Sequence, residues 1–162
     1  GADNKDDRLI TIVFDSIESG IVDMVQELRS RGLRLGVVSN ASDMDVESWP
    51  GCRLETLFDA FIASHEVGIL KPDPRIYNLG LEALCVSAEE AIFVGDGGSN
   101  ELPGAAQVGL RSYFASWFVD RWPLSIRREK YANAGWHDYP DGEPPFPGLR
   151  SPRELLDAIG RL

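Results

Sequence analysis

Polar side chains that could do chemistry follow three apolar runs of this sequence. Asp15 comes directly after LITIVF, Ser39 and Asn40 follow LGVV, and Asp96 follows IFVG. In an open parallel sheet, ligands bind beyond the carboxyl ends of the strands, so these side chains would lie along one edge. Carboxylates there can act as nucleophiles or metal ligands. Taken alone, however, Asp15 is more simply the polar residue that ends a strand.

The segment FVGDGGSNEL contains two carboxylates that could share a cation. Asp96 and Glu101 are five residues apart, around two glycines and near the expected start of a helix. Mg²⁺ takes carboxylate oxygens and water, and usually only one or two protein carboxylates. The pair is therefore a candidate magnesium site. The alternative is a glycine turn before an acidic helix start, where Glu101 favours the helix dipole.

Two further segments could hold a phosphate. VVSNAS offers the Ser39 hydroxyl, the Asn40 amide and backbone N–H groups ahead of a helix, although an ordinary helix cap and turn would use the same residues. GILKPDPRIY places Lys71 between an apolar run and two prolines that stiffen the loop. A lysine held there could offset phosphate or carboxylate charge, and the alternative is a solvated lysine.

Composition excludes several classes of partner. The chain has 26 acidic and 16 basic residues and a formal net charge of −10, which argues against nucleic acid and anionic membranes. No apolar stretch approaches the roughly 18 residues that cross a bilayer, and GADNKDDR is too polar for a signal peptide. Cys52 and Cys85 lack zinc-site spacing, which predicts reduced thiols in a cytoplasmic protein. His65 and His137 are expected to make ordinary hydrogen bonds.

Apolar runs alternate with amphipathic segments along most of the chain, which is typical of α/β proteins. We expect one domain over residues 1–162, with a three-layer, Rossmann-like sandwich around a mostly parallel sheet of about five strands. The motif-bearing core would span residues 9–115. The expected strands are 9–14, 33–38, 60–63, 91–95 and 111–115, and the expected helices begin or run near 19–32, 46–58, 74–84, 100–108 and 151–162.

Residues 117–150, the aromatic segment, show no periodicity. They include three tryptophans, two tyrosines and the proline-rich DGEPPFPG. We expect an irregular stretch over 116–150 whose aromatic side chains attach it to the sheet edge. The alternative is that it covers the site or binds a partner. The following Ser151-Pro152-Arg-Glu154 is a clear helix start, with a capping serine, an early proline and a reciprocal glutamate.

Three segments, taken in order, resemble motifs II, III and IV of the haloacid dehalogenase (HAD) superfamily. The matching residues are Ser39 in GVVSNAS, Lys71 in ILKPDPRIY, and Asp96 with Glu101 in FVGDGGSNEL. The resemblance covers roughly residues 9–115 and implies a Rossmann-like hydrolase that uses Mg²⁺ and an aspartyl phosphate.

The resemblance also implies a role for each residue. Asp15 would be the nucleophile and a metal ligand, and Lys71 would steady its charge. Ser39, with Asn40, would bind the phosphoryl group. Asp96 and Glu101 would hold the metal, with Glu101 standing where an aspartate is more usual.

The first motif departs from the family pattern DxDx[TV]. Asp15 fits the first position, but Ile17 stands at the second and Ser19 replaces the threonine. Isoleucine cannot act as a general acid or base, a contribution typically of about 10²–10⁴ in rate. Glu18 is one residue out of register. Only Ser16 to Ser19 lie where the family carries its cap, so we expect a capless core, in which the cap either was lost or was removed by a deletion.

The predicted function is a Mg²⁺-dependent phosphatase of a small phosphorylated metabolite, with weak or no turnover. One alternative is a non-catalytic relative that binds a partner through the strand-end surface or the aromatic segment. Another is a receiver-like phosphoacceptor.

Overall fold

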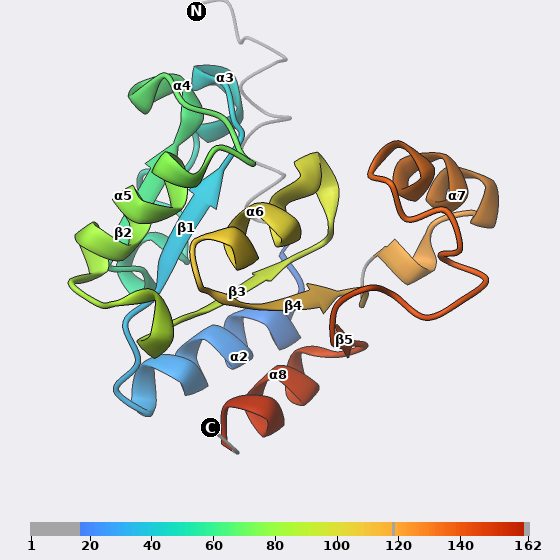
Figure 1. Cartoon of the computed structure of the whole chain (residues 1–162). Helices are drawn as coiled ribbons and strands as arrows, with labels where there is room; N and C mark the ends of the chain where they lie inside the picture. Colours follow the sequence, from blue (N-terminus) through green and yellow to red (C-terminus); the bar gives the residue numbers. More distant parts are fainter. Residues whose placement is uncertain (1–16, 118, 161–162) are drawn as a thin grey trace, which may run out of the picture.

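The computed structural model describes residues 17–117 and 119–160 and has parallel strands covered by helices (Figure 1). In one ladder β1 (Gly36–Ser39) pairs with β2 (Ala60–Ala63), with Gly36 opposite Ala60. In the other, β3 (Ile92–Gly95), β4 (Arg111–Ala115) and β5 (Gly148–Leu149) pair in that order. All pairings are parallel, which confirms the predicted α/β class. The described strands form sheets of two and three strands, smaller than the predicted sheet of about five. The expected strand 9–14 and Asp15 lie outside the described residues, and β5 was not predicted.

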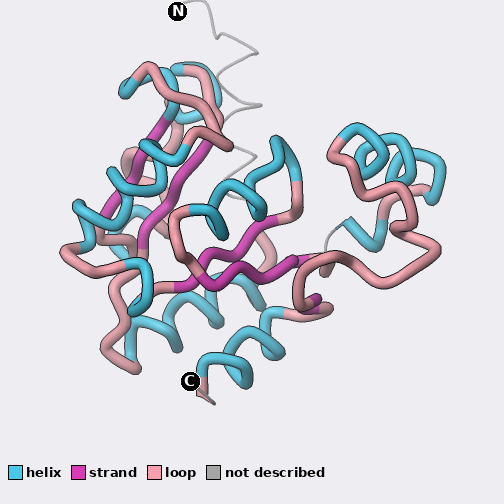
Figure 2. Tube along the Cα trace, in the orientation of Figure 1, coloured by secondary structure: helices cyan, strands magenta, loops and turns pink. Residues whose placement is uncertain are grey.

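Helices and short 3₁₀ turns connect the strands (Figure 2). The helices are α2 (Ser19–Ser30), α3 (Asp43–Val46), α4 (Ser64–Val67), α5 (Pro74–Leu84), α6 (Glu101–Gln107), α7 (Leu124–Asn133) and α8 (Pro152–Ile159). Helices α2, α5, α6 and α8 confirm the predictions near 19–32, 74–84, 100–108 and 151–162. The 3₁₀ turns are η1 (Glu55–Leu57), η2 (Ala88–Glu90), η3 (Gly98–Asn100) and η4 (Val119–Arg121).

The predicted helix over 46–58 is wrong. Helix α3 ends at Val46, and turns lead from there to η1. Pro50 has no N–H to donate to the Val46 carbonyl, and its ring would clash with that group. Gly51 then adopts a left-handed backbone with φ of +85°. These two residues stop the helix despite the apolar side chains that follow.

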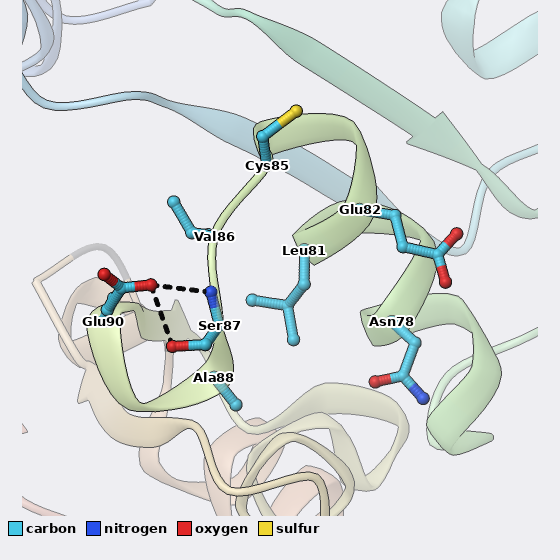
Figure 3. Close-up of a pocket in the computed structure, with 8 residues that line it drawn as sticks. All are labelled: Asn78, Leu81, Glu82, Cys85, Val86, Ser87, Ala88 and Glu90. Carbon is cyan, nitrogen blue, oxygen red and sulfur yellow. Dashed lines mark hydrogen bonds between the residues drawn. The ribbon is translucent and has the colours of Figure 1, made fainter.

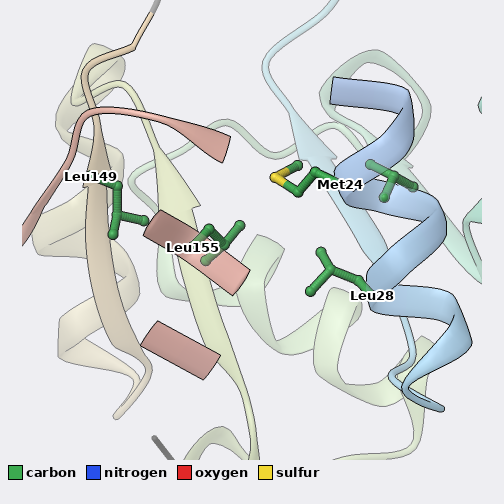
Figure 4. Close-up of a cluster of buried hydrophobic side chains, with 5 residues drawn as sticks. Met24, Leu28, Leu149 and Leu155 are labelled. Atoms are coloured by element: carbon green, nitrogen blue, oxygen red, sulfur yellow. The ribbon is translucent and has the colours of Figure 1, made fainter. Parts of the chain in front are cut away.

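The three layers follow from the alternation of side chains along β3. Ile92 and Val94 pack on one face against α2 and α8, in a cluster that includes Met24, Leu28, Leu149 and Leu155 (Figure 4). Phe93 points to the other face, where it packs against Ile76 and Tyr77 of α5 and Ala105 of α6. Successive strand residues face opposite sides, so both faces of this sheet are covered.

The prediction of an irregular stretch over 116–150 is wrong in part, because the aromatic segment contains η4, α7 and β5. Only Tyr131 of α7 is buried, so the helix has no apolar stripe that the sequence could reveal. The rings of Tyr131, Trp136 and Tyr139 lie 5.1–5.7 Å from the Phe114 ring of β4. This packing confirms that aromatic side chains attach the segment to the sheet.

None of the helices within 17–117 and 119–160 is long and apolar enough to cross a bilayer. Cys52 and Cys85 are both free thiols. The cytoplasmic location stays a prediction.

Candidate active site

The structure joins most of the predicted site residues through direct contacts at the strand ends. Ser39 ends β1 and Asp96 follows β3. Lys71 lies just before α5 and contacts both Asn40 and Glu101. Three separate segments of the sequence therefore meet at one place, as the fold prediction required.

Lys71 and Glu101 form a buried ion pair. The Lys71 ammonium Nζ lies 2.6 Å from Glu101 Oε2, and the two side chains are only 11% and 8% exposed. Burial raises the pKa of Glu101 above its ordinary value, although the positive charge of Lys71 opposes this rise. The solvated lysine considered as an alternative is wrong, because Lys71 is held inside the site.

The backbone around Glu101 is shaped to receive its carboxylate. Oε1 accepts a hydrogen bond from the Gly97 N–H at 3.2 Å. A Cβ at Gly95 would overlap the same oxygen, so a larger residue there would have to displace the carboxylate. The Tyr77 hydroxyl donates to the Glu101 carbonyl at 2.8 Å and fixes the first turn of α6. Glu101 is thus a buried site residue, beyond the role of an acidic helix start.

Asn40 holds the loop that carries Lys71. Its Oδ1 accepts from the Lys71 N–H at 2.7 Å, and its Nδ2 donates to the Lys71 carbonyl at 3.1 Å. Both atoms of the side-chain amide are therefore committed to the lysine backbone. Asn40 positions Lys71, and its predicted contact with phosphate stays a prediction.

The loop after β1 is held by a serine that sequence reasoning missed. Ser64, 5% exposed, accepts from the Ala41 N–H at 3.0 Å and donates to the Ala41 carbonyl at 3.1 Å. His65 Nδ1 lies 3.2 Å from the same carbonyl, which confirms an ordinary hydrogen bond for this histidine. The only sequence signal for Ser64 is its place directly after β2. Ser39 ends β1 beside this loop, and its predicted contact with a phosphoryl group stays a prediction.

A backbone hydrogen bond, an ion pair and a tyrosine hydroxyl hold Asp96 in place. Its Oδ1 accepts from the Gly98 N–H at 2.9 Å, and its Oδ2 lies 3.2 Å from Lys130 Nζ. The Tyr131 hydroxyl donates to the Asp96 carbonyl at 3.1 Å. Trp136 packs so closely under Gly97 that a Cβ there would lie 2.7 Å from the indole ring. The aromatic segment thus borders the site, a contact that no local sequence pattern indicated.

Asp96 and Glu101 are the described carboxylates that could hold the predicted magnesium ion. They offer two carboxylates at one loop, and Mg²⁺ commonly uses one or two carboxylates with waters and substrate phosphate. Among the described residues no group of three potential metal ligands occurs. The third predicted ligand, Asp15, lies outside the described residues.

Glu18 is the described acidic residue nearest in sequence to the first motif, and it is not placed to replace the missing acid. Glu18 pairs with Arg121 at the exposed surface, and this hydrogen bond lowers the pKa of Glu18. A carboxyl group with a lowered pKa is a poor general acid near neutral pH. Ile17 contributes only its carbonyl, which accepts from Arg53 at 3.0 Å.

A surface pocket of about 500 Å³ lies elsewhere, at the carboxyl end of α5 (Figure 3). Leu81, Cys85 and Val86 line it, beside the Ser87–Glu90 capping box. Lys71 precedes the opposite end of the same helix. The pocket is therefore separate from the strand-end residues.

Comparison with known families agrees with this geometry. A family model described as haloacid dehalogenase-like hydrolase matches residues 3–109, more than half of the chain. The chain therefore belongs to the haloacid dehalogenase-like hydrolases, as the three motifs predicted. The receiver-like alternative is wrong.

Particular relatives are phosphatases by name. The chain is 30% identical over 148 residues to a glyceraldehyde 3-phosphate phosphatase of Methanopyrus kandleri, covering 88% of this chain and 56% of that protein. It is 42% identical over 96 residues to a phosphoserine phosphatase of Thermus thermophilus, covering 59% of this chain and 37% of that protein. The structure of CbbY from Rhodobacter sphaeroides in complex with phosphate superposes with a TM-score of 0.62 at 28% identity, covering 93% of this chain and 62% of that one. The chain thus spans 37–62% of these relatives' lengths.

Proposed function

We propose that this chain is the core of a Mg²⁺-dependent phosphatase that acts on a small phosphorylated metabolite through an aspartyl phosphate on Asp15. The observation that carries the proposal is the buried Lys71–Glu101 pair, which Asn40 ties to the loop after β1. Relatives that are phosphatases by name, and the phosphate complex of CbbY, support the same class of substrate.

Each residue has a defined task in this proposal. The Asp15 carboxylate bonds to phosphorus as the ester oxygen leaves and takes up a proton. Water then attacks phosphorus, which releases inorganic phosphate and restores the carboxylate. The Ser39 hydroxyl holds a phosphoryl oxygen, and the Lys71 ammonium offsets the negative charge of the carboxylates and the phosphate.

Asp96 and Glu101 would hold the cation. Bound Mg²⁺ supplies positive charge that neutralises phosphate oxygens. Lys71 keeps Glu101 in place beside the proposed cation position, because the ion pair is nearly excluded from water.

Turnover is proposed to be weak, because the chain lacks an acid at the position where the family pattern has one. Ile17 stands at that position, and Glu18 is committed to Arg121. Loss of general acid–base help lowers a rate by about 10²–10⁴. An Ile17→Asp variant should therefore hydrolyse a simple alkyl phosphate, whose alkoxide leaves only when protonated, faster than the wild type in the presence of Mg²⁺.

The nucleophile is tested separately by trapping. With beryllium fluoride and Mg²⁺, the wild type should show a bound acyl-phosphate mimic in ¹⁹F NMR, and Asp15→Asn should not. Equal signals from both proteins would remove Asp15 from the mechanism. If the wild type hydrolyses phosphate esters rapidly and Asp15→Asn does not, the expectation of weak turnover is contradicted, while Asp15 remains the nucleophile.

A second candidate is a non-catalytic family member that binds a partner. The observation in its favour is Ile17 in place of an acid, together with exposed apolar side chains near α7, namely Trp122, Leu124 and Ile126. This candidate predicts that beryllium fluoride is not trapped on Asp15 and that Mg²⁺ does not bind. It also predicts that Asp96→Ala changes partner association alone.

A further inference from the structure

Lys130 of α7 places a second ammonium group at the candidate metal site. Its Nζ lies 3.2 Å from Asp96 Oδ2, and the two side chains are 20% and 26% exposed. The same Nζ lies 5.6 Å from the centre of the Trp122 ring and 5.7 Å from that of Tyr131. Faces of aromatic rings attract cations at such distances. Lys130 is thus held between a carboxylate and two rings.

The position of Lys130 relative to Asp96 is fixed by its neighbours. The Tyr131 hydroxyl donates to the Asp96 carbonyl, and Trp136 packs under Gly97. Tyr131 and Trp136 also stack with ring centres 5.2 Å apart. The helix that carries Lys130 is therefore attached to the same loop that carries Asp96, so the ion pair is part of the packed structure.

The charges of the described site are balanced without a metal. Asp96 and Glu101 carry two negative charges, and Lys71 and Lys130 carry two positive charges. Glu101 Oε2 already faces Lys71, and Asp96 Oδ1 already accepts from a backbone N–H. Among the described residues, Lys130 is a direct partner of Asp96 Oδ2, at 3.2 Å. A cation that binds there must displace Lys130 or share the oxygen with it.

We propose that Lys130 competes with Mg²⁺ for Asp96 Oδ2 and so sets the metal affinity of the site. This inference rests on the proposed function, because it takes Asp96 as a metal ligand. Like charges close to one ligand oxygen disfavour each other, and removal of one strengthens binding of the other. Lys130 acts as a counter-ion that belongs to the chain and is exchanged for the metal.

The test is a titration of Mg²⁺ into the whole chain, followed by calorimetry and without substrate. Lys130→Met should bind Mg²⁺ about tenfold more tightly than the wild type, since one positive charge beside the ligand is gone. The matched control is Arg128→Met, on the same helix, whose exposed ion pair with Asp141 lies outside the site and which should leave the affinity unchanged. Asp96→Asn should abolish binding.

Equal or weaker Mg²⁺ binding by Lys130→Met would overturn the inference and leave the proposed magnesium site intact, provided that Asp96→Asn still loses binding. Absence of binding in every protein would overturn both. Thermal unfolding in EDTA checks that each variant folds. If Lys130→Met does not fold, Lys130→Gln gives the same comparison. Lys130→Arg keeps the positive charge and should bind Mg²⁺ like the wild type.

Discussion

Replacing Lys71 by methionine tests whether the buried ion pair organises the site. The change removes the ammonium but keeps most of the side-chain volume, and it leaves the Glu101 carboxylate, 8% exposed, without its cation. Breaking a buried pair in this way typically costs about 3–5 kcal/mol, because an uncompensated charge remains inside the protein. At about 2–4 °C per kcal/mol for a chain of this size, a cost of about 3 kcal/mol lowers the melting temperature by about 6–12 °C.

The stability lost in Lys71→Met should increase with pH. Burial raises the pKa of Glu101 in the folded state above its ordinary value of 4.5, so the folded state binds the proton more tightly than the unfolded state does. Stability from this group is complete below pH 4.5 and falls as the pH rises through the folded-state pKa. Without Lys71 the pKa rises further, so the gap between Lys71→Met and the wild type should widen from pH 5 to pH 8.

Urea unfolding, followed by circular dichroism and tryptophan fluorescence between pH 5 and pH 8, measures both effects. Arg75→Met is the control, because its ion pair with Asp73 is exposed and should contribute little. Lys71→Met with Glu101→Gln should recover much of the lost stability at pH 8, since no carboxylate is left unpaired. The reasoning is refuted if Lys71→Met costs no more than Arg75→Met, or if its cost is the same at pH 5 and pH 8.

Three further changes test the surroundings of the site. Gly95→Ala should destabilise the fold by about 1–3 kcal/mol and displace Glu101, because the added methyl overlaps that carboxylate. Urea unfolding measures the lost stability, and weakened Mg²⁺ binding would show the displaced carboxylate. Ser64→Ala should lower the free energy of unfolding by about 1–3 kcal/mol through loss of both hydrogen bonds to the loop after β1, and an unchanged urea midpoint would contradict this. Tyr131→Phe keeps the ring packing and loses only the hydrogen bond to the Asp96 carbonyl, so it should cost about 1 kcal/mol in thermal unfolding, and a loss of several kcal/mol would show that the hydroxyl does more.

Several elements could be predicted because their signals are local. Helix α5 begins with Pro74 after a capping Asp73, and α8 begins with Pro152 after Ser151, whose side chain accepts from the Glu154 N–H. Caps and prolines act within one helical turn, so the sequence carries the whole signal. The helix over 46–58 failed for an equally local reason, because Pro50 and Gly51 outweigh the apolar side chains around them.

By itself, the sequence determined the α/β class, the family and which short segments carry the candidate chemistry, since each can be recognised from short motifs and their order along the chain. Only the tertiary structure decided that Lys71 is buried against Glu101, that Asn40 is committed to the Lys71 loop and that Lys130 reaches Asp96. These contacts join residues 30, 31 and 34 positions apart. Their existence depends on how the strands and α7 pack, and neither spacing nor periodicity in the sequence encodes that arrangement.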